Sequence, residues 1–180
     1  MRPWKTLSRR TILDERPWLV VEHHTVELPD GRIIPDWPWI DMPDYVIVVA
    51  ITESKTFACF RQTKYGIEGI SLAPVGGYID PGEEPLAAAQ RELLEEAGFA
   101  ATEWLDLGYY RVDGNRGAGT GHFFLARDAK VVTSLAVHDL EEQELVYLTR
   151  AEIEEALVSG EFKVLGWAAA IALALLHVKA

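Results

Sequence analysis

Three glutamates, Glu92, Glu95 and Glu96, lie close together in a stretch whose residue pattern predicts a helix. At about 100° per residue they fall in one arc of that helix, and spacings of three and four residues bring their side chains together. Like charges at these spacings destabilise a helix, so a helix built only for stability would not gather them. A divalent cation reverses the sign of this interaction. Because the ligand set contains only oxygen, it favours a hard ion, Mg²⁺ or Mn²⁺.

The alternative interpretation of the glutamates is a solvated acidic face, because glutamate is a good helix former. The helix is expected to run from about Pro85 to Ala97, since proline suits the first helical turn and Gly98 follows where a helix can end. Arg91 lies four residues before Glu95 and could orient it. An apolar stripe beside the acidic arc predicts packing against a sheet, and consists of Leu86, Ala89, Leu93 and Ala97.

The spacing of the residues around this helix resembles the Nudix box. Gly77 is followed by five residues and Glu83, and seven more residues lead to Arg91-Glu92-Leu93. Glu95-Glu96 and Gly98-Phe99 complete the pattern. The chain is similar to the Nudix hydrolase superfamily from about Tyr45 to its end.

The resemblance implies an activity and a metal site. Nudix enzymes hydrolyse a nucleoside diphosphate linked to another moiety, using divalent metals held by the box helix. By resemblance, Glu92 and Glu96 are metal ligands, and Glu95 is a further ligand or positions the attacking water. The backbone carbonyl of Gly76 is an additional ligand. The implied cofactor is Mg²⁺, with Mn²⁺ possible; it would polarise the diphosphate and activate water, whose proton a carboxylate removes.

A second acidic cluster, which consists of Asp139, Glu141, Glu142 and Glu144, lies just before the apolar strand residues 145–148. In the ADP-ribose and ADP-sugar pyrophosphatases, the Nudix subfamily that this chain resembles, a loop glutamate at about this place completes the metal site or acts as the base. The register favours Glu141 as this catalytic residue, beside Glu95, with Glu142 as the nearest competitor. A solvated surface loop is the alternative.

A segment before the box points to a subfamily. Residues 61–65, Arg-Gln-Thr-Lys-Tyr, resemble the Arg-Gln-aromatic-Arg segment of ADP-ribose and ADP-sugar pyrophosphatases, so Arg61 and Lys64 are expected to bind substrate. Lys64 keeps the charge of the usual arginine but loses its bidentate geometry. The chain also departs from the pattern at Ala73, where many Nudix proteins have glutamate, and at Asp113-Gly114, where the subfamily has Pro-Gly.

The expected substrate is ADP-ribose or another ADP-sugar, hydrolysed to AMP and a sugar phosphate. Two alternatives stay open. One is another Nudix substrate class, such as dinucleoside polyphosphates, GDP-sugars or coenzyme A. The other is a non-catalytic, nucleotide-sensing Nudix domain, although such proteins usually lose box glutamates and this chain keeps all of them.

Two further residues are candidates for substrate binding. Trp37 lies in a Pro- and Trp-rich stretch and could stack on a base or pack in a dimer interface. Arg116 lies in a Gly-rich segment, residues 113–122, that could wrap a phosphate or a terminal ribose. A flexible connection between strands is the equal alternative for that segment.

Strands and helices are expected to mix without strict alternation, which predicts an α+β fold with helices packed on a mixed β-sheet. The resemblance implies that this fold is a Nudix-like α/β/α sandwich, preceded by an N-terminal β-hairpin. Residues 1–43 are expected to form the hairpin arm and residues 44–180 the Nudix domain. The arm resembles that of the ADP-ribose and ADP-sugar pyrophosphatases, which implies a role in dimerisation and in part of the substrate pocket. The arm's strand covers 18–28 and its return begins at Ile33. Further strands are predicted over 45–51, 56–62, 104–112, 122–126 and 142–148, and helices over 151–158 and 162–178.

Composition sets the remaining expectations. The 180 residues carry a formal net charge of −11, which argues against partners bound through a nucleic-acid backbone or anionic lipid. A single cysteine, Cys59, excludes an internal disulfide and multi-cysteine metal sites. The apolar run 164–178 is shorter than the roughly 20 residues that span a bilayer, so it predicts a buried or interface helix. We expect a cytoplasmic homodimer acting on a nucleoside diphosphate-linked small molecule, with no nucleic-acid or membrane partner.

Overall fold

The computed structural model describes residues 1–133 and 142–178, and the chain divides into two compact units. Unit 1 consists of Met1–Asp44 and Tyr110–Thr120, and unit 2 of Tyr45–Tyr109 and Gly121–Ala180. Glu141, the residue predicted from the second acidic cluster, lies outside the described residues.

Unit 1 is built on three antiparallel strands, β1 (Lys5–Glu15), β2 (Leu19–Glu27) and β3 (Ile33–Asp41). The predicted hairpin is present as β2 and β3, and β1 adds a strand that the sequence pattern did not indicate. All eleven residues of β1 are exposed, so no alternation of apolar and polar residues marks it. Gly117, the first residue of β10 (Gly117–Val131), pairs in parallel with Ile40 of β3.

Unit 2 contains a mixed sheet centred on β4 (Tyr45–Thr52). This strand pairs in parallel with β10 and antiparallel with β5 (Phe57–Gln62) and β7 (Val75–Tyr78). The remaining strands add to β5 and β10: β11 (Gln143–Leu148) and β6 (Ser71–Ala73) pair with β5, and β9 (Glu103–Asp113) and β8 (Phe99–Ala100) with β10. Since every residue of β4 after Tyr45 is buried, its continuous apolar sequence reflects a strand covered on both faces.

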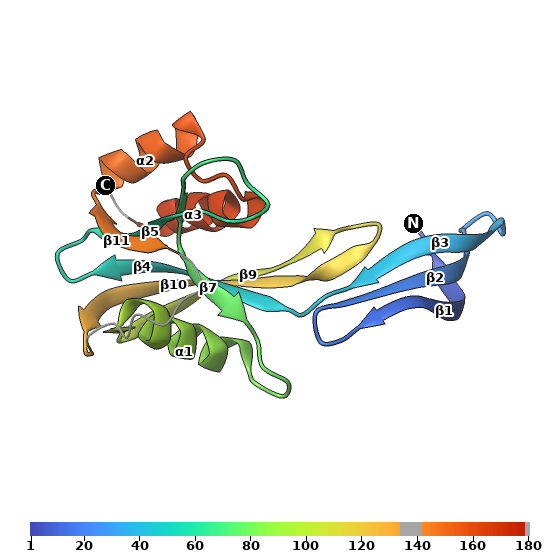
Figure 1. Cartoon of the computed structure of the whole chain (residues 1–180). Coiled ribbons are helices and arrows are strands. Elements are labelled where there is room, and N and C mark those ends of the chain that lie inside the picture. The colour runs from blue at the N-terminus through green and yellow to red at the C-terminus, as the bar shows by residue number, and fades with distance from the viewer. Residues whose placement is uncertain (134–141, 179–180) are drawn as a thin grey trace. The chain divides into compact units, whose positions relative to one another are not determined.

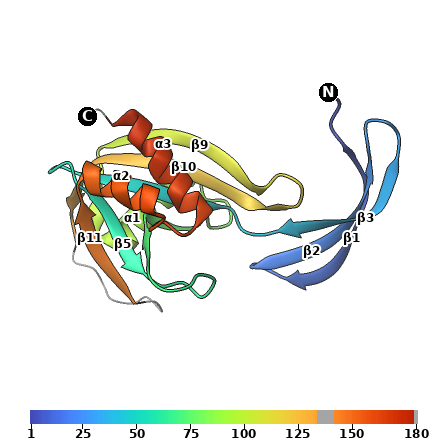
Figure 2. The same cartoon turned by 90° about the horizontal axis from the view of Figure 1, so that it is seen from above.

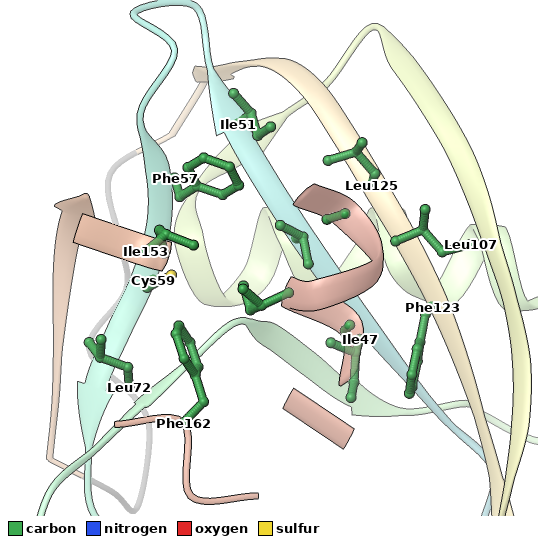
Figure 3. Packing of buried hydrophobic residues seen from close by; sticks show 14 of the residues in the cluster. Ile47, Ile51, Phe57, Cys59, Leu72, Leu107, Phe123, Leu125, Ile153 and Phe162 are labelled. Carbon is green, nitrogen blue, oxygen red and sulfur yellow. The ribbon is translucent and has the colours of Figure 1, made fainter. Parts of the chain in front are cut away.

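Helices cover both faces of this sheet (Figures 1 and 2). α1 (Pro85–Ala97) packs on one face, and α2 (Arg150–Ser159) and α3 (Leu165–His177) on the other. Figure 3 shows the core beneath α2 and α3, where Phe57, Leu125 and Ile153 are fully buried. A second core lies beneath α1 and includes Leu93. The predicted α/β/α sandwich with a mixed sheet is confirmed.

The ends of the helices have local causes. α1 has the predicted bounds and ends at Gly98, which adopts a left-handed conformation (φ 69°). A Cβ at Gly98 would lie 2.5 Å from the carbonyl oxygen of Thr133, and the Gly98 carbonyl accepts the Val132 N–H at 2.9 Å. α3 begins at Leu165, three residues later than predicted. The chain before it is held instead by the Glu161 carbonyl, which accepts the Leu72 N–H of β6 at 2.9 Å.

The apolar C-terminal run forms a buried helix, as predicted. α3 has 13 residues, and its buried residues Ala170, Ile171 and Ala174 belong to the core against the sheet. Among residues 1–133 and 142–178, no helix is both long enough and apolar enough to cross a bilayer.

Candidate active site

Two glycines of β7 bring the main chain close to α1 and β4. Gly76 and Gly77 pair with Ile47 and Val46 of β4. A Cβ at Gly77 would lie 2.2 Å from Oε1 of Glu92, and one at Gly76 would lie 2.6 Å from the Val46 carbonyl oxygen. Any side chain at Gly77 would therefore displace the Glu92 carboxylate, and any side chain at Gly76 would push β7 away from β4.

The packing of α1 determines which way its acidic face points. Ala89 and Leu93 are fully buried against the sheet, so the helix cannot rotate without exposing them. With this face fixed, Glu96 reaches β7, where its Oε2 accepts the Gly76 N–H at 3.1 Å. Glu92 and Glu96 are thus brought to the two adjacent glycines of one strand.

Arg91 ties the loop before α1 to the acidic face. Its guanidinium binds Glu83 in a bidentate manner, with Nε–Oε1 and Nη2–Oε2 distances of 3.0 and 2.9 Å. Nη1 donates to Glu92 Oε1 at 2.7 Å and to Glu95 Oε2 at 3.2 Å, and Nη2 donates to the Tyr78 carbonyl at 3.0 Å. The sequence indicated the contact with Glu95 through its i,i+4 spacing. The role of Glu83 was missed, and its place in the box pattern was the only sign of it.

The charges of this network perturb one another. Burial raises the pKa of Glu92, whose side chain is only 12% exposed, and the hydrogen bond from Arg91 opposes this rise. The hydrogen bonds between Arg91 and Glu83 raise the pKa of the guanidinium and lower that of the carboxyl. Glu92 is therefore a largely desolvated carboxylate whose ionised form depends on nearby positive charge.

The donor set suits a divalent cation. Glu92, Glu95, Glu96 and the Gly76 carbonyl offer only oxygen, which hard ions prefer, and the burial of Glu92 favours an added positive charge. Within residues 1–133 and 142–178, no three carboxylate, imidazole or thiol groups converge as a ready-made metal site. Arg91 binds the carboxylates of Glu92 and Glu95, while Glu96 bonds to the main chain. The assignment of these residues as ligands stays a prediction.

The structure does not bring Arg61 to the face of the sheet on which α1 lies. Arg61 is exposed in β5, opposite Glu144 of β11. Side chains alternate along β5, and Cys59 contributes to the core beneath α2 and α3, whereas Phe60 contributes to the core beneath α1. Arg61 therefore points to the side of α2 and α3. Lys64 is half-buried in the loop that follows β5.

The other predicted substrate-binding residues, Trp37 and Arg116, lie together in unit 1. The Trp37 indole Nε1–H donates to the carbonyl of Asn115, the residue before Arg116, at 2.8 Å. Arg116 is about half exposed and makes a 3.5 Å ion pair with Asp113. Of the acidic pair considered as base, Glu142 is exposed and Glu141 is not among the described residues.

Comparison with known proteins identifies the class to which this fold and box belong. The signature of the NUDIX domain matches residues 42–168, and that of the nucleoside diphosphate sugar hydrolase N-terminal domain matches residues 4–40. The fold and the box together define a Nudix-type hydrolase. The chain belongs to the NUDIX family.

Individual relatives share most of the chain at modest identity. An ADP-ribose pyrophosphatase of Bacillus subtilis (strain 168) is 28% identical over 159 residues, which cover 85% of this chain and 83% of the relative. A CMP-5'-(N-acetyl-N-hydroxy-3-aminopropyl)phosphonate hydrolase of Streptomyces rubellomurinus is 26% identical over 157 residues, covering 87% and 75%. The crystal structure of an ADP compounds hydrolase superposes with a TM-score of 0.79 at 23% identity, covering 97% of this chain and 93% of that one.

Proposed function

We propose that this protein hydrolyses the diphosphate linkage of ADP-ribose or another ADP-sugar, giving AMP and a sugar phosphate. The observation that carries the proposal is the placement of the Glu92 carboxylate over the bare backbone of Gly77, with Glu96 bonded to Gly76 beside it. The similarity to an ADP-ribose pyrophosphatase and the nucleotide-sugar hydrolase signature over residues 4–40 support the substrate class.

The proposal includes a divalent metal, Mg²⁺ in the first place and Mn²⁺ as the alternative. Glu92, Glu95, Glu96 and the carbonyl of Gly76 would hold it. Bound there, it would supply positive charge to the diphosphate oxygens and lower the pKa of the attacking water. The protein's own net charge of −11 offers an anionic substrate no such attraction.

Side chains of the protein would then accept the proton of the attacking water and orient the catalytic groups. Water attacks one phosphorus, a new P–O bond forms, and the bond from that phosphorus to the bridging oxygen breaks. Glu95, which is 59% exposed and held by Arg91, takes the proton of the attacking water, and Glu141 is the second candidate for this role. Arg91 orients Glu95 and keeps the loop containing Glu83 against the helix.

Four residues are proposed to recognise the substrate. Arg61, Lys64 and Arg116 provide positive charge for phosphate or hydrogen bonds to ribose. Trp37 provides an aromatic surface for the base. Since Arg61 points to the side of α2 and α3, its contribution is the one that the geometry of unit 2 supports least.

We further propose that the protein acts as a homodimer. All of β1 is exposed, including the large apolar side chains of Leu7 and Leu13, and Trp18 of the following turn is 62% exposed. Such surface favours a partner that buries it. Light scattering coupled to gel filtration should give twice the chain mass, and a monomeric mass at micromolar concentration would contradict the dimer.

A substrate panel tests the proposed reaction. ADP-ribose, ADP-glucose, GDP-mannose, a dinucleoside polyphosphate and coenzyme A are each incubated with Mg²⁺, with Mn²⁺ or with EDTA, and the products are separated by ion-exchange chromatography. We expect AMP and a sugar phosphate from the ADP-sugars, and no product with EDTA. Carrying out the reaction in H₂¹⁸O and recording ³¹P spectra shows which phosphorus is attacked. Turnover of another compound alone would reassign the substrate class, and binding without product would indicate a sensor.

A further inference from the structure

The end of the β9–β10 hairpin, residues 110–120, belongs to unit 1, whereas the rest of these two strands belongs to unit 2. We call residues 113–117 the hairpin tip. This hairpin tip carries Arg116. The contacts that fix the tip in place therefore come from the N-terminal strands, and they determine where the Arg116 side chain begins.

Two hydrogen bonds connect the hairpin tip to β3. The Trp37 indole donates to the Asn115 carbonyl at 2.8 Å, and the Ile40 N–H donates to the Arg116 carbonyl at 2.9 Å. The next residue, Gly117, pairs with Ile40 in parallel register. The main chain on both sides of the Arg116 side chain is thus bonded to a single strand.

Trp39 closes the space beneath the hairpin tip. Gly117 adopts a left-handed conformation (φ +85°), and a Cβ there would lie 2.7 Å from Cζ2 of Trp39. On its ring face, Trp39 stacks against His24, with ring centroids 5.2 Å apart and an interplanar angle of 17°. His24 is 3% exposed and lies 2.8 Å from Glu22, measured from Nε2 to Oε2. His24 and Glu22 therefore hold Trp39 against the glycine, and the ring face on His24 is closed to a ligand.

The Arg116 side chain stays accessible although its main chain is fixed. About half of the side chain is exposed, and its ion pair with Asp113 is long, at 3.5 Å. Asp113 is committed to the main chain, because its Oδ1 accepts the N–H groups of Asn115 and Arg116 at 2.7 and 2.9 Å. The Arg116 guanidinium is consequently an accessible cation whose main chain is fixed by hydrogen bonds. It is a suitable hydrogen-bond donor for an anionic or hydroxyl-bearing group of a substrate.

We propose that Trp39, supported by His24, is a positioning residue that sets substrate affinity through Arg116. This proposal rests on the proposed function, because it assigns Arg116 to a phosphate or ribose of the diphosphate substrate. Because the main chain at Arg116 is already fixed, less conformational entropy is lost when the guanidinium binds substrate. Loss of Trp39 should weaken binding of the substrate and its transition state equally, which raises KM and leaves kcat unchanged.

A double-mutant cycle on the full-length protein tests this. Trp39→Leu should raise KM about tenfold with kcat within about twofold of the unmutated protein, whereas Trp39→Phe, which keeps a ring over Gly117, should restore KM. In an Arg116→Ala background the same Trp39→Leu change should alter KM less than about twofold, because the residue acts through Arg116. Ile33→Ala, at a residue of β3 that is 59% exposed, is the control and should leave KM unchanged. Equal KM effects in both backgrounds, or an unchanged KM in Trp39→Leu, would overturn the proposal.

Amide hydrogen exchange separates failure of this inference from failure of the proposed function. In Trp39→Leu the N–H groups of Ile40, Asn115 and Arg116 should exchange faster by about tenfold or more, while those of α1 and β4 keep their protection. If the unmutated protein hydrolyses none of the panel compounds, the proposed function fails. In that case unchanged exchange at these three amides would also refute the positioning role. Accelerated exchange would still show that Trp39 fixes the main chain of the hairpin tip, and only the link to substrate affinity would be lost.

Discussion

The two units hold their candidate functional side chains in different ways. In unit 2, α1 is anchored by Ala88, Ala89 and Leu93, none of which is exposed, and Glu92 and Glu96 then reach the main chain of β7. In unit 1, β1 is exposed along its whole length, and the hairpin tip with Arg116 depends on contacts from Trp37 and Trp39. Burial of an apolar stripe fixes the orientation of a whole helix and of every side chain on it. A few aromatic contacts between residues far apart in the sequence fix only one short segment.

The largest effect should come from removing charge on the acidic face of α1. Glu95→Gln and Glu96→Gln should each lower kcat/KM by about 10²–10⁴-fold, because they remove a proposed base or ligand while keeping the side-chain volume. Circular dichroism and the thermal midpoint should stay close to those of the unmutated protein. Near-normal activity in both variants would show that this face is not the site.

The core beneath α1 should respond more strongly to truncation than the exposed strand of unit 1. Leu93→Ala removes a fully buried side chain and should lower the free energy of unfolding by about 2–5 kcal/mol. Leu7→Ala in β1, where the side chain is 43% exposed, should change it by no more than about 0.5 kcal/mol in the monomer. Urea titrations of both variants provide the measurement, and equal losses would remove the contrast between the units.

A smaller effect on activity is expected at the glycine beneath Glu92. Gly77→Ala introduces a methyl group where the carboxylate lies, so the carboxylate must rotate away and kcat/KM should fall about 10–100-fold, with little loss of stability. Gly66→Ala is the control, since nothing lies within 4 Å of a Cβ there and its φ is unremarkable for an L residue. Equal activity in the two alanine variants would mean that the Glu92 position is unimportant.

The smallest effect is expected at Cys59, in the core on the other face of the sheet. Cys59 is 1% exposed, and burial raises the pKa of its thiol to about 12 from the ordinary value of 9.0. Since the thiolate is the reactive form, the native protein should hold about 1,000-fold less of it than a free thiol below pH 9 and should resist Ellman's reagent. Full labelling should require urea, and rapid labelling of the native protein would contradict a closed core.

The contrast also explains what could be predicted from the sequence. α1 has its predicted bounds because proline, an apolar stripe and Gly98 mark its start, face and end within one short stretch. β1 escaped prediction because all of its residues are exposed and no face of it alternates. Periodicity reports burial, so an element that buries nothing in its own chain leaves no pattern.

The contacts of the site divide in the same manner. The Arg91–Glu95 pair follows from helical spacing, which places residues four apart on one face. The bidentate contact with Glu83 depends on the path of the loop before α1, and the Trp37–Asn115 bond joins positions 78 residues apart. Helical spacing predicts neither contact, because each depends on how segments outside one helix come together in the folded chain.

Gly98 has a consequence for anyone who engineers this protein. The same position ends the box helix and leaves room for the Thr133 carbonyl, and its own carbonyl accepts the Val132 N–H. A library that varies position 98 would alter the helix terminus and the chain leaving β10 in one step. Loss of activity in such a library could therefore not be attributed to either change alone.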